Sequence, residues 1–418
     1  MPESDEKLAH NIAIKSYDII LIGAGPVGLT MAITLAQNGF KIALVEKAPL
    51  SFIEQPQHDG RGYALSYGTI MIFKALGLWH FIENIASPIR SIHVQENKTP
   101  CYLNFEADQI NAAAAMGFLV ESHILRDMLW HGYVEQKDNI TLITEAEILD
   151  FKQDPHQAII HLNDQILSAP LLIAADGRHS SFKQRLNIQS KTFPYNHHAL
   201  VTRFKHEKPH NHRAYEYFYP AGPFAILPLM GNESSLVWCD KPEIVTTLKT
   251  LNNDDFAAHI YERFSDLGTI SCNADRFSYP LSAILSEKLY QGRVVLLGDA
   301  AQAIHPVAGQ GLNLGMRGLA ELAEHIVNAR LHGQDWGDSF VLDAYQKKIL
   351  STRRKFFILM HGLVKLYDID FKPLSMIRNI GLGLVNRLPP LKHAMMREAM
   401  GAGSKQPKLM RGETLIAK

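Results

Sequence analysis

The chain has 418 residues, of which 46% are hydrophobic and 20% charged, a balance typical of soluble globular proteins rather than disordered or fibrous ones. This length favours two or three domains and is enough to bury a large cofactor. Lysine plus arginine equals aspartate plus glutamate at 42 each, so the average surface gives no reason to expect a nucleic-acid partner. Three widely spaced cysteines predict neither a disulfide framework nor a zinc site; they are Cys101, Cys239 and Cys272.

The N-terminal segment up to Ser16 is polar and lacks the basic start and apolar run of a signal peptide. No stretch of about 18 uninterrupted apolar residues occurs, which is the length that a membrane-spanning helix needs. We therefore expect a cytoplasmic protein that does not span a membrane.

The first predicted elements form a strand, turn, helix and strand. Residues 18–22 predict a strand, residues 29–38 a helix ended by Gly39, and residues 41–45 a second strand that ends in Glu46. The turn is a GxGxxG motif, whose glycines permit a pyrophosphate to approach the free amides of the helix. Its residues are Gly23, Gly25, Pro26 and Gly28. Glu46 is placed to hold ribose hydroxyls, so the unit predicts a dinucleotide site without separating FAD from NAD.

Two further predicted strands end in acidic residues. Residues 171–175 lead into Asp176, and residues 293–297 lead into Asp299, before a helix from about Gln310. Because open α/β sheets bind ligands at the carboxyl ends of their strands, both aspartates are candidate site residues.

Between these strands, residues 192–277 alternate apolar and aromatic residues with turn signals, which predicts an inserted antiparallel sheet. Some of its side chains are candidates for a substrate pocket, although such residues equally suit the core of a sheet. The candidates are Tyr217, Phe224, Ile226 and Pro228.

Residues 298–315, GDAAQAIHPVAGQGLNLG, resemble the second FAD motif of the class A flavin hydroxylases. Residues 175–183, ADGRHSSFK, resemble the Asp-Gly motif of the same class, although Lys183 stands where arginine is usual. Gln302, together with residues 222–229, GPFAILPL, makes the chain similar to the ubiquinone-biosynthesis hydroxylases of the 2-polyprenyl-6-methoxyphenol hydroxylase type.

The resemblance implies an α/β fold with a Rossmann-like FAD-binding domain of the glutathione-reductase type. Its two parts would be residues 17–191 and 278–345, with a substrate sheet in 192–277 and C-terminal helices and a basic tail in 346–418. It also implies that Asp299 contacts the ribityl chain of FAD, while a glycine-rich turn offers amides to the flavin ring. The further cofactor-binding residues that it implies are Gly309, Gly311, Leu312, Asn313, Arg61 and Arg126.

The resemblance further implies an FAD-dependent monooxygenase that hydroxylates the ring of a polyprenylated phenol in ubiquinone biosynthesis. Oxygen would be delivered from a flavin hydroperoxide formed with O2, with NAD(P)H or a protein electron donor as reductant. His305 and Pro306 would lie on the flavin side of the pocket, where His305 either helps to deprotonate a phenol or shapes the turn. The other clustered histidines lack the spacing of metal ligands, so no metal site is predicted.

Two alternatives share the FAD motifs. A flavin-dependent reductase or hydroxylase could act on another aromatic or isoprenoid substrate, and a non-catalytic module could use only the fold. Oxygen labelling of the product separates a reductase from a hydroxylase. Bleaching of the flavin by NAD(P)H tests for the non-catalytic module.

The C-terminal segment is basic. Residues 353–418 contain 13 Lys or Arg against 4 Asp or Glu. Within it, residues 374–388 repeat apolar residues at helical spacing, with Arg378 and Arg387 at intervening positions. We expect this tail to meet the inner face of a membrane or a complex of ubiquinone biosynthesis, unless the apolar face of residues 374–388 packs onto the FAD-binding domain.

Overall fold

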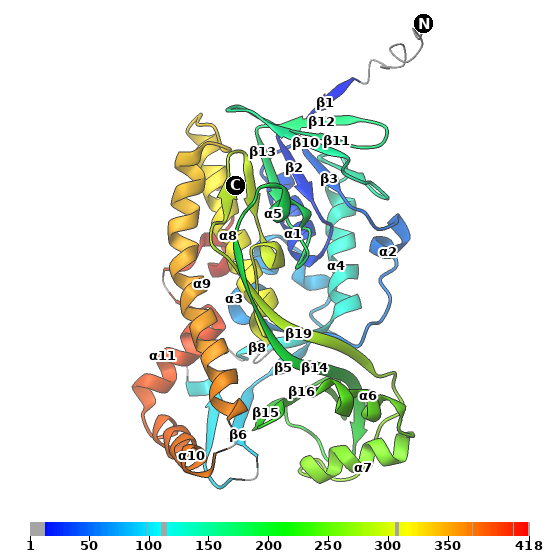
Figure 1. Ribbon diagram of the computed structural model, residues 1–418, viewed down its shortest axis with the longest axis vertical. Helices are drawn as coiled ribbons and strands as arrows, with labels where there is room; N and C mark the ends of the chain where they lie inside the picture. Colours follow the sequence, from blue (N-terminus) through cyan, green and yellow to red (C-terminus); the bar gives the residue numbers. More distant parts are fainter. Residues whose placement is uncertain are drawn as a thin grey trace, which may run out of the picture.

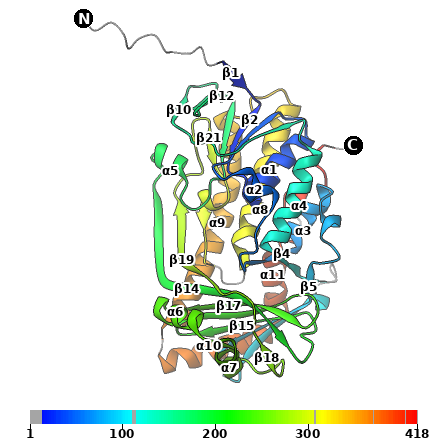
Figure 2. The same cartoon turned by 90° about the vertical axis from the view of Figure 1, so that its right-hand side faces the viewer.

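The computed structural model describes residues 13–97, 99–109, 115–305, 309–369, 371–403 and 405–416. Two regions share one chain (Figures 1 and 2). One region surrounds a mostly parallel sheet, the other is a large sheet at the opposite end, and the long helix α9 (Ser339–Asp368) runs along both.

The first region is built on a six-stranded sheet. Its strand order is β20, β21, β13, β2, β3, β9, and the strands span Tyr290–Gln291, Val294–Leu296, Leu171–Ala174, Ile19–Ile22, Ile42–Val45 and Ile140–Ile143. Neighbouring strands from β21 to β9 pair in parallel. The central strands are apolar on both faces because helices or other strands cover both sides, as a buried parallel sheet requires.

Helices and smaller sheets complete this region. Its helices are α1 (Pro26–Gln37), α2 (Leu50–Glu54), α3 (Tyr67–Ala75), α4 (Ser122–Glu135), α5 (Ser181–Arg185) and α8 (Gln310–Leu331). One small sheet contains β1 (Ile14–Ser16), β12 (Ile166–Ala169), β11 (Ala158–His161) and β10 (Asp150–Gln153). The other contains β4 (Gly62–Ser66), β8 (Gly117–Glu121) and β5 (Ser87–Ile89).

The second region is a nine-stranded sheet that two helices cover. Its order is β22 (Gln302–Ala303), β19 (Phe277–Ser286), β14 (Ser190–His206), β17 (Glu233–Asp240), β16 (Gly222–Pro228), β15 (Arg213–Tyr219), β6 (Ser91–Glu96) and β7 (Tyr102–Glu106), with β18 (Ile270–Ser271) paired to β14. Helices α6 (Pro242–Thr250) and α7 (Asn253–Arg263) pack on one face.

The predicted α/β fold with a large additional sheet and C-terminal helices is confirmed, with two corrections to its boundaries. Strands β6 and β7 come from the segment assigned to the first region, and β6 pairs in parallel with β15. The sheet is therefore not wholly antiparallel. Without β6, β15 would be an edge strand with unpaired backbone groups, and β6 supplies its partner. The C-terminal helices begin at Ser339 rather than at residue 346.

The C-terminal helices α9, α10 (Lys372–Asn386) and α11 (Pro389–Met400) follow one side of the molecule (Figure 1). The chain then returns to the first region, where a short 3-10 helix, residues 408–411, packs on α3. Leu409, Met410 and Leu415 are buried in the main core, so the end of the basic tail is part of the fold.

Candidate functional site

The predicted motifs lie together because their strands are neighbours. β21, β13, β2 and β3 are adjacent and parallel, so the residues that follow them share one edge of the sheet. A Cβ atom added to Gly23, after β2, would lie 2.5 Å from the carbonyl oxygen of Ala175, after β13. One added to Gly298, after β21, would lie 3.3 Å from Val27 on α1. Segments far apart in sequence thus form one site.

The glycine-rich turn is shaped for close approach of a ligand. Gly23 has a φ of +99°, which favours glycine, and a Cβ at Gly28 would lie 2.0 Å from the carbonyl oxygen of Gly23. Gly25 caps α1, and the space beside it is open. Pro26 takes the first helical position, where its missing N–H costs nothing. The free amides of α1 can therefore receive a phosphate.

Glu46 and Arg126 lie at the same edge. Glu46 accepts hydrogen bonds from the backbone N–H groups of Ala24 at 2.7 Å and Ala48 at 2.9 Å, which ties the strand end to the glycine turn. Arg126, on α4, donates to the carbonyl oxygen of Phe52 and lies over the Phe52 ring at 4.2 Å. Glu46 is one of the charges that act on Arg126, so an acceptor and a cation border the turn together.

Asp176 and Asp299 contribute carboxylates from neighbouring strand ends. Asp176 accepts from the Ser181 N–H through Oδ2, whereas its buried Oδ1 has no hydrogen-bond partner in the described part of the chain. Asp299 is exposed to solvent, yet the protein surrounds it closely enough that burial raises the pKa of its carboxyl group, against the charges of Arg178 and Arg61. We infer from this combination that Asp299 lies in a hollow at the strand ends, which solvent reaches and the protein surrounds.

Arg61 is held beside this hollow. Its guanidinium donates to Asp59 Oδ2, with Nε at 2.9 Å, and lies 5.6 Å from the centre of the Tyr279 ring. Tyr63, two residues further along β4, interacts electrostatically with both Arg61 and Asp299, and burial raises the pKa of its hydroxyl. Arg61 and Tyr63 thus both lie close enough to Asp299 for their charges to interact with it.

Helix α8 begins beside β4. Gly309 caps it with a φ of +61°, and the space beside Gly311 is open. The amides of Gly311 and Leu312, in the first turn, have no partner within the helix and can donate to a ligand. The side chain of Asn313 is already committed, because it donates to the carbonyl oxygen of Ala64 and accepts from Ser66 and Thr69. The side chain of Asn313 therefore joins the start of α8 to β4.

His305 is fully buried and stacks edge-on against Tyr195, with ring centres 4.8 Å apart. Burial, aided by the charge of His197, lowers the pKa of His305 to about 3. Such an imidazole is neutral at physiological pH and a weak proton acceptor, which favours a role in packing over deprotonation of a phenol. Pro306 lies outside the described residues.

The two faces of the large sheet have different neighbours. Tyr217, Phe224 and Ile226 belong to the core beneath α6 and α7. The opposite face carries Phe218 and Cys239, which pack with residues on both sides of the turn before α8, Ile304 and Leu314. This corrects the expectation that Tyr217, Phe224 and Ile226 line the pocket, because they point away from the hollow. Pro228, also buried, ends the same strand as Phe224 and Ile226 in the same alternation.

Glu216 is a further residue of interest, to which the sequence pattern gave no role. It stands between Tyr215 and Tyr217 on β15, so alternation places its side chain on the face that carries Phe218. Burial raises the pKa of its carboxyl group to about 8. At neutral pH this group is mostly protonated and can donate a hydrogen bond, and it becomes a proton acceptor at mildly alkaline pH.

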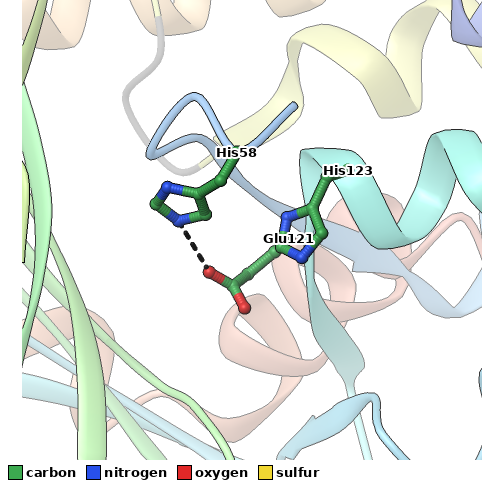
Figure 3. A group of neighbouring side chains, drawn as sticks. All are labelled: His58, Glu121 and His123. Atoms are coloured by element: carbon green, nitrogen blue, oxygen red, sulfur yellow. Dashed lines mark hydrogen bonds and ion pairs between the residues drawn. The ribbon is translucent and has the colours of Figure 1, made fainter. Parts of the chain in front are cut away.

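His58, Glu121 and His123 lie close together (Figure 3), and His58 directly precedes Asp59 in the chain. His58 Nε2 lies 3.2 Å from Glu121 Oε1, and the candidate ligand atoms of all three residues lie within 4.8 Å of one another. Arg203 Nη1 is 3.8 Å from the same Glu121 oxygen, so a metal ion here would compete with a guanidinium. Ser122, between Glu121 and His123, donates to Asp59 at 3.2 Å, which gives the group a part in positioning Asp59.

Residues 16–356 match a protein family described as an FAD binding domain. Ubiquinone hydroxylase UbiL of Rhodospirillum rubrum is 35% identical over 408 residues, which cover 96% of this chain and 94% of the relative. The 3-demethoxyubiquinol 3-hydroxylase of Escherichia coli is 31% identical over 391 residues, which cover 92% of this chain and 98% of the relative. The chain belongs to the FAD-dependent ubiquinone hydroxylases.

Solved structures of other proteins share the fold of this hydroxylase. The p-nitrophenol 4-monooxygenase PnpA of Pseudomonas putida superposes with a TM-score of 0.76 at 15% identity, covering 93% of this chain and all of PnpA. PqsL of Pseudomonas aeruginosa, a probable FAD-dependent monooxygenase, gives 0.72 at 19% identity, covering 87% of this chain and 100% of PqsL. At these identities the likeness shows a shared fold.

The hollow fits FAD on its own features. Open space beside Gly25 and Gly311, free amides at two helix starts and the unpartnered Oδ1 of Asp176 match a long, anionic, hydrogen-bonding ligand. This hydroxylase is an FAD-dependent monooxygenase, as the sequence predicted.

Proposed function

We propose that this hydroxylase introduces one hydroxyl group into the aromatic ring of a polyprenylated phenol during ubiquinone biosynthesis. The observation that carries the proposal is the position of the apolar face of the large sheet directly beside the segment that follows Asp299. The relatives supply the substrate class, since one is named a 3-demethoxyubiquinol 3-hydroxylase and others ubiquinone hydroxylases.

The residues of the proposed cofactor site divide into two groups. The glycine turn, with Glu46, Arg126 and the start of α1, would hold the adenosine and pyrophosphate part. Asp299, Asp176, Arg61 and the first turn of α8 would hold the ribityl chain and the ring. Bound FAD supplies the electron transfer and oxygen activation, with O2 as cosubstrate and NAD(P)H or a protein donor as the source of electrons.

The chain's own contribution is a dry pocket and a place for one proton. Phe218 stacks on Tyr367 of α9, with ring centres 4.1 Å apart, and helps to exclude water from the flavin-facing side of the sheet. Glu216 faces the same side, and we propose that its carboxyl group binds the phenolic hydroxyl and accepts its proton. His305 keeps a neutral, buried position and shapes the turn.

A deletion strain tests the function. Cells that lack the protein should make little ubiquinone and accumulate a prenylated phenol with one hydroxyl group too few. Wild-type protein and the control Asp254→Ala, which changes an exposed carboxylate on α7, should restore ubiquinone, whereas Asp299→Ala should restore less. Normal ubiquinone in the aerobic deletion strain, with no second homologue in its genome, would contradict the proposal.

We also propose that the protein works at the inner face of a membrane, where a polyprenylated substrate resides, or in a complex of ubiquinone biosynthesis. Among the described residues, no helix is long and apolar enough to cross a bilayer. The distal basic residues Lys408 and Arg411 flank Leu409 and Met410, which are buried in the main core. Removal of everything after Met400 would expose that core, so point variants are the better test of the tail.

A further inference from the structure

Helix α10 is attached to the protein through its polar side. Arg378 and Asn379 are 7% and 9% exposed, and both contact the buried carboxylate of Glu96 on β6. Arg378 Nε donates to Glu96 Oε1 at 2.9 Å, and Asn379 Nδ2 donates to Glu96 Oε2 at 3.0 Å. Arg378 also donates to two carbonyl oxygens at the end of α9. The alternative in which the apolar face of residues 374–388 packs onto the FAD-binding domain is therefore contradicted.

The opposite side of α10 is apolar and faces solvent. Met376, Ile377, Ile380 and Leu384 are 68%, 65%, 65% and 56% exposed. At 100° per residue they span an arc of about 100°; no charged residue of α10 itself falls within it, and Arg387, the C-cap, follows on the same side. Large apolar residues that precede and follow the helix are exposed as well; they are Ile369, Phe371, Leu388 and Leu391. An exposed group of this size marks an interaction surface.

The buried contacts fix which side faces outward. Rotation of α10 to bury its apolar arc would pull Arg378 away from Glu96 and leave a buried charge without its partner, which is strongly destabilising. Asn386 adds a second constraint, because its side-chain oxygen accepts from the backbone N–H of Asn104 on β7. The exposure of the apolar face is thus built into the fold.

The surroundings of the apolar face are basic. Residues 371–397 contain five Lys or Arg and no Asp or Glu, although Arg378 is paired with Glu96 and Lys392 is buried. Of the nearest acidic residues, Asp368 pairs with Lys365 and Glu398 with Arg317, while Asp370 lies outside the described residues. Arg387 and Arg397 are exposed. A second copy of this chain would bring like charges together across a two-fold interface, whereas an anionic lipid surface complements them.

We infer that the apolar face of α10 inserts into the interfacial region of an anionic lipid bilayer and docks the hydroxylase there. An interfacial helix normally presents one apolar side to lipid and one polar side to water. In α10 the polar side does not face water, because it contacts β6 and β7. The inference deepens the proposed function and rests on it for the choice of a lipid surface as the source of substrate.

The position of the apolar face suits transfer of a lipid-borne substrate. α10 packs on β6 and β7, and β6 pairs with β15, the strand of Glu216 and Phe218. Tyr367, two residues before Ile369, stacks on Phe218. A small cavity at this end of α9 is lined by Phe218, Tyr367 and His197, among others. Helix α10 therefore lies beside the end of α9 and close to β15, the strand of Glu216 (Figure 1).

The test uses full-length protein carrying FAD and vesicles of phosphatidylglycerol and phosphatidylethanolamine without quinone. The variant Ile377→Ser with Ile380→Ser should reduce sedimentation with these vesicles at low salt by about tenfold or more, because two inserted aliphatic side chains are lost. The matched control, Leu149→Ser with Ile244→Ser, removes residues that are 56% and 45% exposed elsewhere on the surface and should bind like wild type. FAD content and melting temperature should be equal in all three proteins.

Equal sedimentation of the I377S/I380S variant and wild type would overturn the inference. So would a wild-type dimer, seen by light scattering, that the same variant dissociates while neither protein binds vesicles, since the face would then join two copies. Turnover of a short-chain, water-soluble prenylphenol is measured in parallel. Its absence in every variant would count against the proposed function alone, and vesicle binding would still decide the inference.

Discussion

Replacement of Asp299 by alanine should weaken FAD binding without unfolding the protein. Asp299 is exposed inside the hollow, at the end of β21, with the charges of Arg61 and Arg178 close enough to act on its pKa. A hydrogen bond to a charged acceptor contributes about 1.5–3 kcal/mol, which corresponds to a roughly 10- to 150-fold higher dissociation constant when it is lost. Burial raises the pKa of this carboxyl group, which means that the charged form is costly to hold there. Removing the carboxylate also removes that cost, so we expect a loss of binding free energy in the lower half of the range.

The assay is titration of apoprotein with FAD, followed by the quenching of flavin fluorescence. Asp299→Asn keeps an oxygen acceptor without the charge and should fall between wild type and Asp299→Ala. Asp254→Ala, far from the hollow on α7, should bind FAD like wild type. A dissociation constant for Asp299→Ala within twofold of wild type, at an unchanged melting temperature, would refute the assignment of Asp299 to the ribityl chain.

Three further predictions concern single side chains. Glu46→Ala removes the acceptor of the Ala24 and Ala48 amides and should weaken FAD binding by about tenfold in the same titration; unchanged affinity would make Glu46 a structural residue only. Glu216→Gln should abolish the rise of the hydroxylation rate between pH 7 and 9 that a carboxyl pKa of about 8 gives wild type, and an identical pH profile would exclude Glu216 as proton acceptor. Since burial lowers the pKa of His305 to about 3 from 6.5, the unfolded chain binds a proton between these values that the folded protein does not. Stability should therefore fall as pH drops, by about 2 kcal/mol between pH 7 and pH 5, and His305→Phe should remove that portion in chemical denaturation. An equal loss in both proteins would contradict the buried, neutral state of His305.

The cofactor site could be predicted from sequence because its determinants are local. A short apolar run followed by glycines, or by Asp176 or Asp299, identifies a strand end wherever it occurs in the chain. The parallel order of β21, β13, β2 and β3 then brings these ends together without any further information. The positions of Arg61 and Arg126 followed from the family resemblance, because nothing in their local sequence distinguishes them from surface arginines.

The substrate side depended on facts that are not local. Alternation shows that Tyr217 and Phe224 share a face, but which face meets the hollow is decided by α6 and α7, which cover the other side. Strands β6 and β7 join the same sheet from a distant part of the chain, which no periodicity reveals. Glu216 stands between two tyrosines in the sequence, but nothing there distinguishes it from an exposed glutamate. Only the structure shows the burial that raises the pKa of its carboxyl group.

Helix α10 shows the same limit for helices. Its periodicity predicted one apolar and one polar side, and both are present. The usual assumption that the apolar side is buried failed because Glu96, 282 residues away in the chain, offers Arg378 a buried partner. A sequence pattern gives the sides of a helix, and the tertiary contacts decide which of them meets solvent.

The most direct test of the central claim is hydroxylation under 18O2. Purified protein with FAD, a reductant and a short-chain 2-prenylphenol should give a product that is heavier by one 18O atom, detected by mass spectrometry and dependent on Asp299. No label should enter when 18O is supplied as water instead. A product that carries no 18O from O2, or a reduced prenyl chain with an unchanged ring, would contradict the assignment as an aromatic hydroxylase and favour a flavin-dependent reductase.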